Sequence, residues 1–138
     1  MQNPDLPLPP MSPAARSVFV FALYLVPVGA GLLATPNTVL TLLGFPASSE
    51  IWPRVVGVLA LALAYYYAQA ARGNVTAFFR WSIHARSAVC VAFVALVLLR
   101  VAPAPLALMG LVDLFAAGWT ARALRREMGA GAHAAKRA

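Results

Sequence analysis

Asp113 and Arg86 are ionisable residues inside apolar sequence, where charged side chains are rare and usually functional. Asp113 lies near the middle of the apolar run 104–124, where a carboxylate in a bilayer costs roughly 2.5 to 3.5 kcal/mol. Small residues surround it at three- and four-residue spacings: Ala107, Gly110, Ala117 and Ala121. This spacing makes a close-packing helix face and predicts that Asp113 faces other helices instead of lipid.

Candidate partners for Asp113 come from matching depths along neighbouring helices. Arg86 has a side chain long enough to reach about one helical turn inward. Tyr65, Tyr66 and Tyr67 lie at a comparable depth, and because successive residues are about 100° apart, at most one or two of them face the bundle. Asp113 is then either a structural latch bonded to Arg86 or a tyrosine, or the proton- or cation-binding carboxylate of a carrier.

A second polar group precedes the apolar run that starts at Ser87. Arg72, Arg80 and His84, with Trp81 among them, are candidate contacts for anionic lipid headgroups, a phosphate-bearing substrate or an acidic partner. The same pattern is typical of basic residues and an interfacial Trp flanking a membrane span. Arg86 is the deepest of the group and fits that simpler interpretation least well.

Other chemistries find little support in the sequence. Cys90 is the single cysteine and lies in an apolar run, which favours a small buried hydrophobe over a metal ligand. The zinc-protease, CxxC, Walker, GxSxG and paired-carboxylate patterns are absent, so we expect no metal, no cofactor and no enzymatic activity. The basic residues do not form one stripe with interleaved aromatics, which argues against nucleic acid as a partner.

The composition identifies the environment of these residues. The 138-residue chain is 62% hydrophobic and 11% charged, against about 45–50% and about 25% in soluble domains. A soluble domain of this size has no room to bury so much apolar surface, whereas a lipid bilayer accepts it on every outward face. We therefore expect the lipid bilayer to be the main partner of the chain.

The apolar runs predict an all-α integral membrane four-helix bundle. The predicted domain covers residues 16–125, with transmembrane helices at about 17–35, 53–71, 79–101 and 104–124. A Pro-rich segment, 1–15, is predicted to be a flexible tail, and 126–138 a basic C-terminal tail. The connection between the first two helices is too short to span and too apolar for water, which predicts a short interfacial helix. Pro27, Gly29 and Gly31 predict a kink or a close helix approach in the first span.

The distribution of Lys and Arg predicts the orientation. Nine basic residues fall on the side of both termini: Arg16, Arg72, Arg80, Arg86, Arg122, Arg125, Arg126, Lys136 and Arg137. Only Arg54 and Arg100 fall on the other side, so the positive-inside rule places both termini in the cytoplasm. Ten of the eleven basic residues are Arg, which favours a GC-rich bacterial genome.

The middle of the chain also carries a pattern of short motifs: Leu-Leu-Gly-Phe-Pro at 42–46, Trp-Pro-Arg at 52–54, Gly57, Tyr65 to Tyr67, and 79–86. This layout resembles small four-span bacterial inner-membrane proteins of uncharacterised families. The resemblance implies a multi-pass protein of the bacterial inner membrane, and it implies no catalytic activity.

The sequence therefore favours a structural or accessory membrane component. Small-residue faces at Gly57, Ala60 and Ala64, and at Ala88, Ala92 and Ala95, offer surfaces for a homo-oligomer or a partner in a membrane complex. The alternative is a small carrier for a proton-coupled or lipophilic substrate that uses Asp113. A membrane enzyme acting on a lipid or quinone comes third, because no nucleophile–base pair is evident.

Overall fold

The computed structural model describes residues 10–135, with side chains up to residue 131, and within these limits all regular structure is α-helical. The helices are α1 (Pro13–Ala34), α2 (Pro36–Leu42), α3 (Trp52–Arg72), α4 (Thr76–Leu98) and α5 (Pro105–Ala135). Four helices are long and apolar enough to cross a membrane: α1, α3, α4 and, within α5, the segment Pro105–Gly131. The all-α class and the short helix between the first two spans are confirmed, and the four apolar helices suggest a multi-pass membrane protein.

The start of α1 corrects the predicted boundary at residue 17. The Ser12 hydroxyl accepts a hydrogen bond from the Ala15 N–H at 3.1 Å, and Pro13 occupies the first turn. A Ser cap followed by Pro is a strong helix-start signal, because Pro lacks the N–H that would have no partner there. Ala14 and Ala15 are fully buried. Residues 13–15 thus belong to the packed helix, while 1–9 of the predicted tail lie outside the described residues.

The last two helices also differ from their predicted limits. α4 begins at Thr76, three residues before the predicted start, and α5 runs to Ala135. The predicted basic tail from 126 is therefore helical as far as residue 135, and 136–138 lie outside the described part. This stretch contains no proline, and Ala, Arg, Glu and Met have high helix propensity, which offsets Gly129 and Gly131.

Three helices end in the same hydrogen-bonded turn. After α2, the Phe45 N–H donates to the Leu40 carbonyl at 2.8 Å and the Gly44 N–H to the Thr41 carbonyl at 3.0 Å. Gly44 has φ +74°, so this is a Schellman motif with glycine in the left-handed position. Asn74 after α3 and Arg100 after α4 take the same position, with φ +49° and +57°. The Leu-Leu-Gly-Phe motif therefore marks a helix stop.

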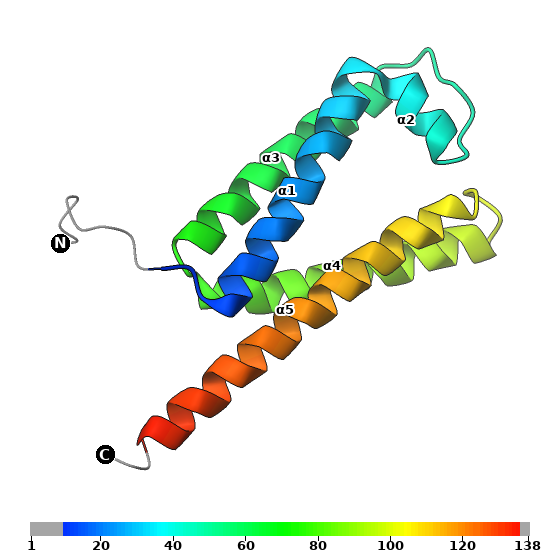
Figure 1. Ribbon diagram of the computed structural model, residues 1–138. Helices are drawn as coiled ribbons and strands as arrows, with labels where there is room; N and C mark the ends of the chain where they lie inside the picture. Colours follow the sequence, from blue (N-terminus) through cyan, green and yellow to red (C-terminus); the bar gives the residue numbers. More distant parts are fainter. Residues whose placement is uncertain (1–9, 136–138) are drawn as a thin grey trace.

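The helices form two hairpins, α1 with α3 and α4 with α5, which meet near the start of α1 and diverge towards α2 (Figure 1). We call the region where they meet the junction. Its buried core consists of Ala14, Ala15, Val18, Phe21, Ala22, Tyr67, Ala71, Phe79, Ala123 and Leu124. Away from the junction most positions of the long helices are not buried, so each hairpin presents apolar side chains outward.

Glycines set the spacing inside each hairpin. A Cβ on Gly57 of α3 would lie 2.7 Å from the Gly29 carbonyl oxygen of α1, so the two backbones touch there. In the other hairpin, a Cβ on Gly110 would lie 3.1 Å from the Cys90 Cα. These close approaches are typical of membrane helix pairs, in which small residues allow extensive backbone contact. Cys90 is buried at this crossing and is a free thiol.

Candidate functional site

Arg86 lies at the centre of the junction, although it is a charged residue. Only 3% of its surface is exposed, and its neighbours come from all four long helices. Phe21 of α1, Tyr67 of α3 and Thr120 of α5 converge on its side chain, which extends from the middle of α4. A helical side chain leans towards the N-terminus of its own helix, so the guanidinium reaches back towards Ser82. We call these residues, with Ser17 of α1, the arginine centre.

On one side of the guanidinium, the N–H groups of Arg86 donate hydrogen bonds to two hydroxyl groups and one backbone carbonyl. Arg86 Nη2 donates to Ser82 Oγ at 3.1 Å and to Thr120 Oγ1 at 3.3 Å, and Nε donates to the Ser82 carbonyl at 3.4 Å. The Ser17 hydroxyl donates to Thr120 Oγ1 at 2.9 Å. Thr120 itself donates to the Ala116 carbonyl at 3.0 Å. Both helices α1 and α5 are thereby connected to Arg86 through one threonine.

Aromatic rings cover the guanidinium. Its central carbon lies 4.3 Å from the centroid of the Phe21 ring and 5.4 Å from that of Tyr67. The two rings also pack on each other, with centroids 5.2 Å apart. A cation above an aromatic ring is attracted by the ring quadrupole, and this attraction grows when water is excluded. Stacking by a planar guanidinium is a property that lysine does not share.

One donor of the arginine centre has no partner. Arg86 Nη1 is buried and makes no hydrogen bond to any described residue. A buried unsatisfied donor is costly, and the positive charge also has to be compensated. The stacked rings and the hydroxyl acceptors provide that compensation. The arrangement connects side chains of all four long helices.

Asp113 lies outside this network. It is half-buried on α5 and within electrostatic range of Arg86, yet the hydrogen bonds of Arg86 go to Ser82 and Thr120. Gly110 and Ala117 on the same face of α5 are buried, whereas Ala107 and Ala121 are partly exposed. The small-residue face thus packs against α4 and the junction, and Asp113 stands beside it without direct bonding to Arg86. Among the described residues, the hydrogen bond between α4 and α5 at the arginine centre comes from Arg86 and not from Asp113.

The three adjacent tyrosines separate as helical geometry requires. Tyr67 is 5% exposed and belongs to the arginine centre, while Tyr65 and Tyr66 are about three-fifths exposed, at 61% and 62%. Tyr65 and Tyr66 contact each other edge to face, with centroids 6.0 Å apart. Of the three, only Tyr67 is buried beside Arg86.

The predicted headgroup contacts are all on the surface. Arg72, Arg80 and His84 are exposed near the turn between α3 and α4. Arg80 Nη2 lies 3.5 Å from the Met128 sulfur of α5, and the other two have no described side-chain bond. Among residues 10–131, no group of three or more His, Cys, Asp and Glu side chains is arranged to hold a metal ion.

No family model, curated protein or solved structure matches this chain. The interpretation of the arginine centre therefore depends on its geometry alone.

Sequence reasoning missed Ser17, Phe21 and Thr120 as members of the site. Ser17 and Thr120 carried a usable signal, because each is a hydroxyl within an apolar span, at a depth that matches Ser82. Hydroxyls in membrane helices are often interhelical hydrogen-bonding groups. Phe21 carried no such signal, because one phenylalanine in an apolar run does not differ from the others.

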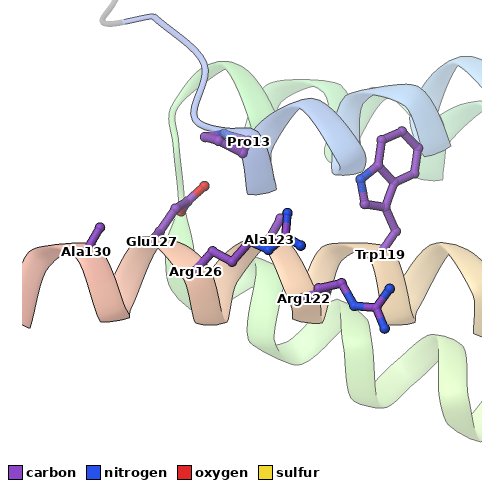
Figure 2. A pocket seen from close by; sticks show the side chains of 7 residues that line it. All are labelled: Pro13, Trp119, Arg122, Ala123, Arg126, Glu127 and Ala130. Atoms are coloured by element: carbon purple, nitrogen blue, oxygen red, sulfur yellow. The ribbon is translucent and has the colours of Figure 1, made fainter.

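A hollowed surface follows the second half of α5. One pocket of about 380 Å³ lies between α5 and the start of α1 and is lined by Pro13, Trp119, Arg122, Ala123, Arg126, Glu127 and Ala130 (Figure 2). Glu127 extends towards α1, where its Oε1 accepts a hydrogen bond from the Ala14 N–H at 2.7 Å. A carboxylate at a helix N-terminus also stabilises the helix dipole. Glu127 therefore connects α5 to the beginning of α1.

Proposed function

We propose that the chain is a structural or accessory component of the bacterial inner membrane, with four spans and both termini in the cytoplasm. The apolar helices support insertion, and the excess of basic residues on the side of the termini supports the orientation. The observation that carries the proposal is the arginine centre. Its donors and rings are directed at one another across four helices, which favours a role in holding the fold over a role in chemistry.

The diverging hairpins leave surfaces for another membrane helix. Of the small-residue faces, Gly57 and Ala64 are used inside the α1–α3 hairpin, where they are buried. Ala88, Ala92 and Ala95 of α4 are exposed on one face, at four- and three-residue spacings. Such a face allows close approach of a second helix in lipid. This supports association through α4, either with a second copy or within a larger membrane complex.

A comparison of two variants tests the association. Ala92→Leu should block close approach on α4, whereas Ala62→Leu on the exposed surface of α3 adds the same volume elsewhere. Native mass spectrometry after gentle purification should detect a stoichiometric protein partner or second copy in the parent and in Ala62→Leu, and lose it in Ala92→Leu. A monodisperse monomer of the parent without partner, in several mild detergents and in nanodiscs, would refute the accessory role.

A small carrier remains the second candidate, and Asp113 is the observation that favours it. The carboxyl group is half-buried in the middle of α5 and is not bonded to the nearby Arg86. An acid without a fixed partner retains the capacity to bind a proton or cation. Asp113→Asn should preserve the fold and abolish proton-coupled flux in proteoliposomes. Absence of any such flux in the parent protein would exclude this candidate.

A further inference from the structure

Two adjacent pockets on α5 share Trp119 and Arg122. The first is the pocket beside the start of α1, and the second, of about 610 Å³, is lined by Phe115, Gly118, Trp119 and Arg122. Residues 115, 118, 119, 122 and 126 recur at three- and four-residue spacings, so the two pockets form one continuous groove along a single helix face. We call it the α5 groove.

The two ends of the α5 groove differ in chemistry. At one end Phe115 and Trp119 are exposed aromatic walls, and Gly118 is a floor whose missing Cβ would meet nothing within 4 Å. At the other end Arg122 and Arg126 are exposed cations, with Arg126 lying along α5 between Trp119 and Glu127 in Figure 2. Glu127 is the one acid there, and its Oε1 is bonded to the Ala14 N–H. The groove is thus apolar at one end and cationic at the other.

The change from apolar to cationic residues along the groove matches the change from hydrocarbon to headgroups across one leaflet of a bilayer. At 1.5 Å per residue, Arg122 lies about 26 Å and Arg126 about 32 Å along α5 from Pro105. A hydrocarbon core is about 30 Å thick, so when Pro105 lies at one boundary these arginines lie at the headgroups of the other leaflet. Phe115, Gly118 and Trp119 lie about 15, 20 and 21 Å along α5, which is acyl-chain depth.

We propose that the α5 groove binds an anionic phospholipid. Arg122 and Arg126 bind the phosphate and its anionic headgroup, and Phe115, Gly118 and Trp119 hold an acyl chain. Arginine suits this role because its planar guanidinium binds phosphate oxygens in pairs. The Trp119 ring lines both pockets and lies between the apolar and the cationic end of the groove.

The test uses the full chain in phosphatidylcholine nanodiscs with a minor share of phosphatidylglycerol, followed by native mass spectrometry of retained lipids. Arg122→Gln with Arg126→Gln should weaken phosphatidylglycerol retention about fivefold for each arginine, or about 25-fold together. Arg125→Gln is the matched control, because Arg125 is exposed on the same helical turns but does not line either pocket. A second variant, Gly118→Leu, fills the apolar end without a backbone clash and should reduce retention of both lipids.

The outcomes separate a built site from general membrane electrostatics. The proposal is overturned if the parent shows no preference for phosphatidylglycerol, or if Arg125→Gln weakens retention as much as the Arg122 and Arg126 changes. Inorganic phosphate added in excess should not displace the lipid, because the acyl chain supplies much of the binding. Displacement by phosphate would show that the groove binds free anions instead.

Discussion

Removing the stacked cation from the arginine centre should lower the stability of the bundle measurably. Arg86→Met keeps an unbranched chain as far as the position of Nε but removes the guanidinium carbon, which lies 4.3 Å from the centroid of the Phe21 ring. A desolvated cation–aromatic pair contributes about 2 kcal/mol. The interhelical bond to Thr120 adds about 0.6 kcal/mol, an average for membrane proteins. Removing the buried and unpaired Nη1 donor offsets part of this loss, so we expect a net loss of about 2 kcal/mol once the more distant Tyr67 ring is included.

A double-mutant cycle isolates the stacking. Phe21→Leu, Arg86→Met and the double variant should give a coupling free energy of about 2 kcal/mol. Reversible unfolding by SDS titration in mixed micelles, followed by tryptophan fluorescence, measures each stability. Arg80→Met on the exposed surface of the same helix is the control and should change stability by less than about 0.5 kcal/mol. Coupling below about 0.5 kcal/mol, or an Arg86→Met variant as stable as the parent, would refute the reasoning.

Three further substitutions test the helix contacts and turns by the same unfolding assay. Gly57→Ala places a Cβ 2.7 Å from the α1 backbone and should lower the free energy of unfolding by about 2 kcal/mol. Gly118→Ala is the control, because its Cβ meets nothing within 4 Å, and it should be neutral or stabilising. Equal effects of the two substitutions would contradict the close crossing of α1 and α3. Arg100→Gly should raise stability by about 1 kcal/mol, because only glycine adopts φ +57° without strain, and a decrease would argue against that strain. Glu127→Ala should lower the free energy of unfolding by about 1 kcal/mol, because it leaves the Ala14 N–H without its acceptor. Glu127→Gln keeps an acceptor oxygen and should recover most of this loss. A Glu127→Ala variant as stable as the parent would show that the bond is dispensable.

Hydropathy predicted the elements well, because length and apolar content alone identify spans. The second predicted helix, 53–71, differs from α3 (Trp52–Arg72) by one residue at each end. The start of α1 was predicted too late, because composition made Pro13 resemble the tail before it. Ser12 followed by Pro13 was the signal for a capped helix, and it outweighs the proline content of the segment.

The arginine centre was only partly predictable. Arg86 was identified because a charge in an apolar span needs compensation, but the sequence suggested Asp113 as its partner. Charge pairing is the simplest form of compensation, and sequence alone does not show that two aromatic rings and two hydroxyls replace it. Which side of α4 faces which helix depends on the antiparallel pairing of α4 with α5, and that register comes from the Gly110–Cys90 crossing.

The junction is also the point about which the two hairpins would rotate relative to each other. Each hairpin extends about 20 Å from the arginine centre to its far end, so a rotation of about 10° there moves the far ends by about 3.5 Å relative to each other. The loop after α2 approaches the start of α5 there, where a Cβ on Gly44 would lie 3.1 Å from Pro105 Cγ. Because this contact lies far from the junction, a small change in packing around Arg86 displaces it more than any contact near the junction.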